Sequence, residues 1–473
     1  MRGGGVSAAA LSAALQPHRY LWPRDDLAAT GWKRTTGGMW QRRLPESDAA
    51  VAADSRWPAL FPSPVCLVTA AHGAAMVLER VVGPSIVNRF PYVLALSFCV
   101  EPLSDRHYAR RAFTTVLEAG GGAAVQLLPP GPALDRALAA IETTPERETS
   151  ARLTRSGLAT RRALTSAAPV FTDAYLVYEG RLVRPGRDFE GQPIYPQPWL
   201  DVGSHRVYFL EVTAIQLRRD IAEGRSQIRW RSLPAWSPAA VTRAAPRTKA
   251  AGPGAGYQKP YTPHYAFPSA GTIAFEADEL ADGMAVKRLP SEKADQVEVD
   301  NDRARWPCFF PSSVGMITTW AADGRPNLMP CGSTTVLSRQ PLVIAPCVGY
   351  AAINERYAPR LTLELIRKNR AFGCGVPFIG ERIVEAIKYA GNVSWQAAGD
   401  KVAQAGLVVA RGGPAPVLTD LPVHFDCEVV DEVRLGTHVM FLGAVRRIRV
   451  RRDVSAANPL EWCPWADVRP VDG

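Results

Sequence analysis

The sequence lacks several features that would assign it to a class directly. Its 473 residues contain no run of about 18 apolar residues, so we expect no membrane-spanning helix. None of the eight cysteines forms a Cys-x-x-Cys pair, and the seven histidines show no spacing typical of metal ligands, so no zinc site is predicted. The cysteines are expected to be reduced and mostly buried, which is typical of a cytoplasmic protein.

The positive charge lacks the organisation that nucleic-acid binding requires. The formal net charge is +10, but much of it comes from arginines scattered among alanine and proline. Neither a clustered basic face nor a known nucleic-acid-binding motif is present, so no nucleic-acid partner is expected. The charge favours the attraction of anionic small molecules instead.

The sequence does contain an internal similarity between its two halves. Segment 56–69 reappears at 305–318 with eight of fourteen positions identical, at a shift of 249 residues. Segment 38–45 matches 283–290 at almost the same shift. Ordered matches over this length predict a tandem duplication of a whole domain.

Near their ends the two copies are offset by a different amount. Segment 203–212 resembles 436–445 at a shift of 233 residues. The first copy therefore holds about sixteen additional residues, and the loop-like segment 181–198 is the predicted place for them.

Four regions follow from these boundaries. They are an N-terminal extension (1–37), a first domain (38–231), a Pro/Ala/Gly-rich linker (232–282) and a second domain (283–473). The Ala-rich start of the chain is broken by Ser, Gln and Pro. We expect a frayed or helical leader, with a weak secretion signal as the alternative.

The second copy has the clearer secondary-structure pattern. Short apolar and β-branched runs predict strands at 314–320, 334–337 and 341–346, with a tight hairpin at Asp323-Gly324. The remaining pattern predicts helices at 359–367, 381–389 and 399–405, and paired strands at 423–430 and 438–450. Short strands dominate, which predicts a mainly β fold with peripheral helices in place of a doubly wound parallel sheet.

The order of these segments resembles a known family. PSSVGMITTWAADGRPNLMPCGSTTVLSRQPLVIAP, PRLTLELIRKNRAFGCGVP and LPVHFDCEVVDEVRLGTHVMFLGAVRRIRV are similar to the flavin reductase-like, FMN-binding split β-barrel family over about residues 305–450. The resemblance implies two such split β-barrel domains that form an intramolecular pseudo-dimer. It also implies an FMN site in a groove on the barrel, at the interface between the two.

The resemblance places the flavin site in the second copy. The residues that it implies for cofactor binding are Asn327, Leu328, Met329, Cys331, Ser333, Thr334, Thr335, Arg360 and Thr362, and it places His438 near the flavin or nicotinamide as the catalytic candidate. A phosphate with about two negative charges needs hydroxyls, backbone N–H groups and an arginine. Arg360 and Thr362 lie in the first turn of a predicted helix, where anions are favoured. The alternatives are a turn role for Asn327, an ordinary solvated helix start at Arg360 and a purely structural His438.

The first copy departs from this pattern. At the 249-residue shift Asn327, Ser333, Thr335 and Thr362 become Leu78, Pro84, Ile86 and Phe113, and only Ser85 and Arg111 keep polar groups. We therefore predict that the first copy has lost or altered its flavin site and serves as a built-in partner of the second. His205 is the expected counterpart of His438. The chain is expected to be a pseudo-dimeric monomer, with a homodimer as the alternative.

The function that the resemblance implies is that of an FMN-dependent oxidoreductase, with FAD as an alternative cofactor. NAD(P)H would deliver hydride to the flavin, and the electrons would pass to free flavin, a partner flavin-dependent monooxygenase or a small organic substrate. No Gly-x-Gly-x-x-Gly fingerprint is present, which agrees with the lack of a separate dinucleotide domain. The alternatives are a biosynthetic oxidoreductase for one metabolite, and a non-catalytic barrel that binds FMN or haem or acts as a scaffold.

Overall fold

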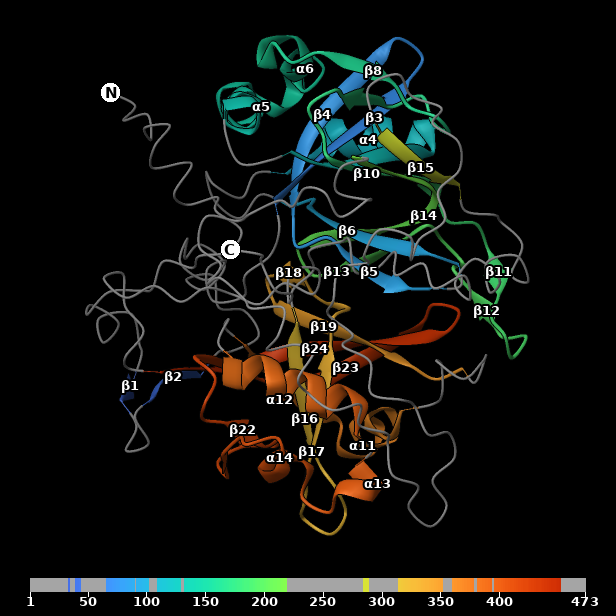
Figure 1. Cartoon of the computed structure of the whole chain (residues 1–473). Coiled ribbons are helices and arrows are strands. Elements are labelled where there is room, and N and C mark those ends of the chain that lie inside the picture. Colours follow the sequence, from blue (N-terminus) through green and yellow to red (C-terminus); the bar gives the residue numbers. More distant parts are fainter. Residues whose placement is uncertain are drawn as a thin grey trace.

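The structure is a computed structural model, and Figure 1 shows two β-sheet halves, one above the other. It describes residues 33–34, 39–43, 65–89, 91–101, 109–128, 132–218, 284–288, 314–351, 360–377, 381–393 and 395–451. The predicted linker, the repeated segments 56–64 and 305–313 and nearly all of the predicted N-terminal extension lie outside these residues.

The first half is built on one antiparallel sheet with the strand order β4-β3-β7-β10-β14-β6-β5. Its strands are β3 (Val65–His72), β4 (Ala75–Val82), β5 (Ser85–Asn88), β6 (Val93–Cys99), β7 (Gly122–Leu127), β10 (Leu176–Leu182), β13 (Trp199–Val202) and β14 (His205–Arg218). The helices are α4 (Arg111–Gly120), α5 (Pro132–Thr143), the short 3₁₀ helix η2 (Glu146–Glu148) and α6 (Ala151–Ser156). Two small hairpins, β8 (Thr160–Arg162) with β9 (Pro169–Phe171) and β11 (Gly186–Arg187) with β12 (Pro193–Ile194), complete it.

The second half repeats this strand order as β17-β16-β20-β23-β24-β19-β18. Its strands are β16 (Gly315–Trp320), β17 (Pro326–Cys331), β18 (Thr334–Arg339), β19 (Leu342–Gly349), β20 (Ala371–Val376), β23 (Val423–Arg434) and β24 (His438–Arg451), with the small pair β21 (Val409–Ala410) and β22 (Val417–Leu418). The helices are α11 (Leu361–Asn369), α12 (Glu381–Asn392), α13 (Trp395–Ala398) and α14 (Lys401–Gln404). The mainly β fold with peripheral helices is thus confirmed.

Alternation along the strands explains why each half forms two cores. Along β10, Leu176 and Tyr178 belong to the core enclosed by the sheet, whereas Val177 faces a second core that includes Ile141 of α5. Successive side chains of a strand point to opposite faces, so a continuous apolar strand is buried on both sides. The second half has the same two layers, one within the sheet and one beneath α12.

Strand pairing shows how the two halves correspond. Thr69 faces Leu78 across β3 and β4, and Thr318 faces Leu328 across β16 and β17. Leu78 therefore corresponds to Leu328 at a shift of 250 residues, because the hairpin after β16 is one residue longer than that after β3. The 249-residue alignment was wrong by one over this stretch. The counterparts of Asn327, Ser333, Thr334 and Thr335 are Val77, Gly83, Pro84 and Ser85. The tandem duplication stays a prediction, which the shared strand order supports.

Each half also receives a strand from the segment that precedes the other half. β2 (Met39–Arg43), with β1 (Lys33–Arg34) beside it, pairs with β24, and β15 (Met284–Arg288) pairs with β14. In Figure 1 the blue strands β1 and β2 accompany the lower, orange-red half, while the yellow β15 lies in the upper half. The two halves in space therefore do not coincide with sequence boundaries at 38 and 283.

A third apolar core joins the halves. Val93, Ala95 and Phe209 of the first half pack with Val343 and Met440 of the second. Hydrogen bonds cross the same interface, and Ser97 Oγ donates to Leu337 O over 2.6 Å. Within the part of the chain that the structure describes, no helix is long and apolar enough to cross a membrane, and no three metal-ligating side chains gather.

Candidate functional site

The first feature of the candidate site is a histidine held by a turn. β23 and β24 are joined by Leu435–Thr437, and His438 begins β24 opposite Gly349, the last residue of β19. His438 Nδ1 lies 2.7 Å from Thr437 Oγ1. Asn88 of the first half accepts hydrogen bonds at Oδ1 from the backbone N–H groups of Thr437 and His438, over 2.9 and 3.1 Å. The histidine is therefore oriented from both halves.

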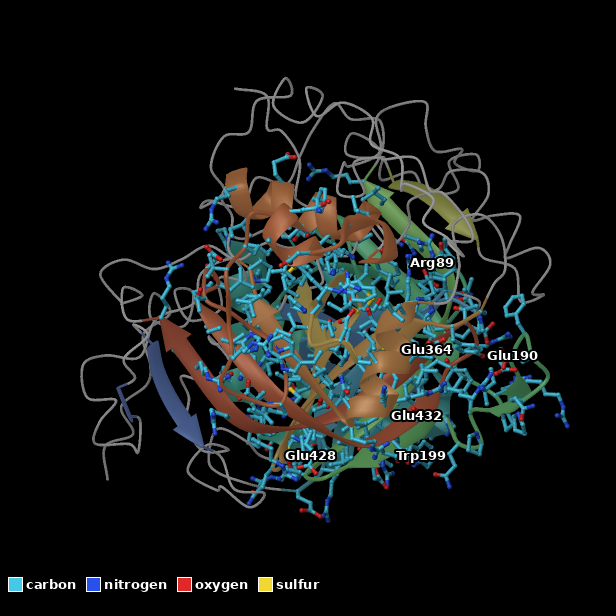
Figure 2. All side chains as sticks on the ribbon, turned by 90° about the horizontal axis from the view of Figure 1, so that it is seen from below. Arg89, Glu190, Trp199, Glu364, Glu428 and Glu432 are labelled. Atoms are coloured by element: carbon cyan, nitrogen blue, oxygen red, sulfur yellow. The ribbon has the colours of Figure 1, made fainter. Side chains whose placement is uncertain are left out.

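Two arginines from opposite halves act on this histidine through their charge. The pKa of His438 is lowered to about 3, chiefly by burial and also by the positive charges of Arg89 and Arg360. Arg89 belongs to the first half and Arg360 to the second. In Figure 2, which views the molecule from below, the labels of Arg89 of the first half and of Glu364 of α11 both lie to the right of centre. His438 is consequently neutral at neutral pH, beside a concentration of positive charge that suits an anion.

Arg360 is the N-cap residue of α11, and its backbone N–H donates to Gly349 O over 3.2 Å. In the next turn Thr362 is buried, and its Oγ1 accepts from Asn327 Nδ2 over 2.9 Å. Asn327 is 2% exposed and lies 3.3 Å from Thr319 Oγ1 through the same nitrogen. The structure thus brings Asn327, Arg360 and Thr362 together at the start of α11.

The other predicted residues of β17 point in different directions. Leu328 faces away from Asn327 into the core beneath α12. Met329 packs against the core within the sheet, and Cys331 is buried in that core. Burial raises the pKa of the Cys331 thiol, and its Sγ donates to Cys347 O over 3.4 Å. The Leu328 side chain therefore points away from the Asn327 side of the strand, because alternate side chains of a strand face opposite sides, and its place in the site stays a prediction.

The three hydroxyl side chains of Ser333, Thr334 and Thr335 also differ in their hydrogen bonds. Ser333 is half-buried in the turn before β18. Thr334 is buried and donates from Oγ1 to Cys331 O over 3.0 Å. Thr335 is buried and donates from Oγ1 to Gly83 O of the first half. Thr334 and Thr335 therefore use their hydroxyls within the protein, so of the three only the Ser333 side chain has no such internal bond among the described residues.

The first half contains a matching group of residues. We call His205 with Ser204 and Arg110 the first station, or His205 station, and His438 with Thr437 and Arg360 the second station, or His438 station. His205 Nδ1 lies 2.8 Å from Ser204 Oγ, and burial lowers the pKa of His205 to about 3, with Arg110 and Arg339 adding to the effect. Arg110 is the N-cap residue of α4 and bonds Cys99 O as Arg360 bonds Gly349 O. Arg110, and not Arg111 as the sequence alignment predicted, is therefore the structural counterpart of Arg360.

The two stations differ in what meets the helix N-terminus. In the first half, Glu146 Oε1 accepts from the backbone N–H groups of Ala112 and Phe113 over 2.7 and 3.1 Å. The buried Glu79 lies 3.4 Å from Arg110 and 2.6 Å from the buried Arg152. In the second half, no side chain among the described residues accepts from the start of α11. Carboxylates of the first half thus meet its helix start and its arginine, whereas the backbone N–H groups at the start of α11 meet no described side chain.

Sequence reasoning missed the residues that act across the halves. Arg434 contacts Asp188 and Glu190 of the additional segment of the first half, and Tyr195 Oη donates to Leu435 O over 2.8 Å. Burial alone would raise the pKa of Asp188, but hydrogen bonds from Tyr350, from the Gln192 backbone and from Arg434 together lower it. The additional segment therefore braces the turn that carries His438. No local pattern in either copy marks such contacts.

Comparison with known proteins identifies the second half. A family model described as the flavin reductase like domain matches residues 307–466. The second half is a flavin reductase-like domain. The histidine, the start of α11 and the β17–β18 segment described above all belong to this flavin reductase-like domain, whereas Asn88, Arg89 and the bracing segment come from the first half.

Individual relatives are distant. An uncharacterized protein of Aeropyrum pernix is 29% identical over 105 residues, which span 22% of this chain and only 38% of that protein. Flavoredoxin of Desulfovibrio vulgaris has 24% identity and a TM-score of 0.26, covering 30% of this chain and 70% of its own. The NADH:FAD oxidoreductase of Streptomyces globisporus has 18% identity and a TM-score of 0.30, covering 40% and 98%. Values this low bear on neither activity nor cofactor.

Proposed function

We propose that the flavin reductase-like domain binds FMN beside His438 and the start of α11, and that the protein is an FMN-dependent oxidoreductase. The observation that carries this proposal is the contrast between the two helix starts. In the first half Glu146 accepts hydrogen bonds from the backbone N–H groups of Ala112 and Phe113, whereas no described side chain accepts from the backbone N–H groups at the start of α11 in the flavin reductase-like domain. One anionic ligand per chain is the expected complement.

The residues at the start of α11 fit a phosphate monoester. Such a group carries about two negative charges near neutral pH and binds well to an arginine and to free helix N–H groups. Arg360 would supply the guanidinium and α11 the backbone N–H groups, with Ser333 as an additional hydroxyl. Asn327 would turn its side-chain oxygen toward the cofactor, since its Nδ2 already donates to Thr319 and Thr362. Arg89 would add a second positive charge from the first half.

The side chains of the protein itself would orient the bound cofactor. His438 stays neutral, so it can take part in a hydrogen bond with the ligand without adding a charge. A bound flavin would supply the two-electron chemistry, with NAD(P)H as the co-substrate. The acceptor would be free flavin, a flavin-dependent monooxygenase or a small organic substrate. A cytoplasmic location is part of the same proposal.

The test is a titration of the full chain with FMN, followed by reduction with NADH and NADPH in separate experiments. We expect one FMN per chain, and bleaching of the oxidised flavin absorption by at least one nicotinamide. A flavin that binds but resists both reductants would leave a non-catalytic flavin-binding protein. Failure to bind FMN or FAD at all would refute the proposal and favour the barrel as a scaffold or as a site for another ligand such as haem.

A further inference from the structure

Asn88 of the first half contacts the turn that carries His438, and these contacts determine how its amide is oriented. It is 1% exposed, and its Nδ2 donates to Pro91 O over 2.8 Å. Its Oδ1 receives the backbone N–H groups of Thr437 and His438, over 2.9 and 3.1 Å. A backbone N–H can only donate, so the side-chain oxygen, not the nitrogen, must face the turn. The orientation of this amide is therefore fixed by its surroundings.

This orientation determines the direction of the next hydrogen bond. Thr437 Oγ1 lies 2.9 Å from Asn88 Oδ1, which has no hydrogen to give, so the threonine hydroxyl donates its only proton there. The same Thr437 Oγ1 lies 2.7 Å from His438 Nδ1. With its proton committed, the hydroxyl can only accept from the ring, which places the ring proton on Nδ1.

We infer that Asn88 is a positioning residue that holds His438 as the Nδ1–H tautomer, so that Nε2 presents a lone pair to the candidate site. None of the described residues donates to Nε2, which lies on the side of the glycine at position 349. A neutral ring with its proton on Nδ1 accepts a hydrogen bond at Nε2 and cannot give one. The ligand group that meets it must therefore carry an N–H or O–H donor, such as a carboxamide, a ring N–H or a hydroxyl.

The tautomer is inferred from the contacts alone, while the class of ligand rests on the proposed function. The contacts of the hydroxyl beside the ring also differ between His438 and His205. At the equivalent place the first half's histidine, His205, contacts Ser204, whose Oγ lies 3.5 Å from Ser338 Oγ of the second half. A serine hydroxyl can donate or accept, so Ser204 and Ser338 do not by themselves fix the direction of that chain. Asn88→Ser would give the His438 station the residue that the His205 station has.

The test is ¹⁵N NMR of histidine-labelled full-length protein without flavin at neutral pH, with the His438 signals assigned by their loss in His438→Gln. We expect wild-type His438 to show a protonated Nδ1 and an unprotonated Nε2. Asn88→Ser should reduce the Nδ1–H population at least several-fold, whereas Asn88→Asp, which keeps an acceptor oxygen, should preserve it. Unchanged His205 signals and an unchanged Tm serve as controls for folding.

A wild-type His438 protonated on Nε2, or an Asn88→Ser variant with an unaltered tautomer, would overturn the inference. If Asn88→Ser fails to fold, the wild-type and Asn88→Asp spectra still decide it. The role toward the ligand has its own readout with NADH as the probe, whose carboxamide carries an N–H donor: Asn88→Ser should raise KM for NADH several-fold with a smaller change in kcat, and Asn88→Asp should not. A locked tautomer in a protein that binds no flavin would refute the proposed function while leaving the tautomer intact.

Discussion

The two halves share a strand order and a histidine at the start of the last long strand. They differ in the charged groups beside one helix, which is α4 in the first half and α11 in the second. In the first half Glu146 caps α4 and Glu79 lies between Arg110 and Arg152. In the flavin reductase-like domain Met329 stands where Glu79 does, and Asn327, which forms a polar pair with Thr362, stands where Val77 does. A fold can thus persist while internal carboxylates take over the positions where an external anion would bind.

The largest expected effect tests whether the first half is closed by its own ions. Glu79→Met places there the residue of the second half and leaves the fully buried Arg152 without its carboxylate, so we expect a loss of about 3–5 kcal/mol in the free energy of unfolding, measured by urea denaturation. The double variant Glu79→Met/Arg152→Met should recover most of this loss. A single variant as stable as wild type would show that the ion pair does not hold the first half together.

The next effect concerns the two N-cap arginines. Arg360→Ala should weaken FMN binding by at least tenfold, because a hydrogen bond to a charged group contributes about 1.5–3 kcal/mol. Arg110→Ala should change it less than twofold, since Glu79 already neutralises that arginine. Fluorescence quenching of FMN on titration measures both. Equal weakening by the two variants would contradict the assignment of one competent site.

The third prediction concerns stability at low pH and the buried His424 of the second half, whose counterpart in the first half is Val177. The pKa of His424 is lowered to about 3, chiefly by burial and also by the charge of Arg449; neither ring nitrogen has a hydrogen-bond partner among the described residues, and Asp426 Oδ1 lies 3.8 Å from Nε2. The unfolded chain binds this proton near pH 6.5, so the stability that the neutral ring permits is present above that pH and is lost as the pH falls toward 3. From about pH 7 to about pH 5 the loss is about 2 kcal/mol.

His424→Val should therefore flatten the decline of Tm with acid, which thermal melts at a series of pH values will show. The reference variant is His72→Val, an exposed histidine for which little change is expected. A Tm profile in His424→Val that falls as steeply as wild type would assign the acid sensitivity to other groups.

The smallest expected effect is at the polar pair. Asn327→Val gives the second half the residue that the first half has, removes the bond to Thr362, and should weaken FMN binding by less than about tenfold. Val77→Thr in the first half is the matched control and should leave binding unchanged. No change in Asn327→Val would mean that this amide does not face the cofactor.

Much of this molecule was determined by local sequence. β-branched runs predicted β16, β18 and β19, and the apolar periodicity with a proline at 359 predicted α11 within two residues at either end. The strand pair 423–430 and 438–450 was confirmed as β23 and β24, because alternating side chains specify both faces of a strand. The predicted place of the additional residues, 181–198, contains the β11–β12 hairpin.

What the tertiary structure alone decided lies between segments far apart in the chain. Sequence alignment could not register a one-residue difference in a hairpin, so it matched Asn327 to Leu78 and Arg360 to Arg111, whereas strand pairing and the helix caps give Val77 and Arg110. Nor could it show that β2 and β15 exchange between halves, that Glu146 closes one helix start, or that Asn88 directs a proton on His438. Local propensity acts over a few residues, while these contacts arise only when distant side chains meet in a packed, water-excluding interface.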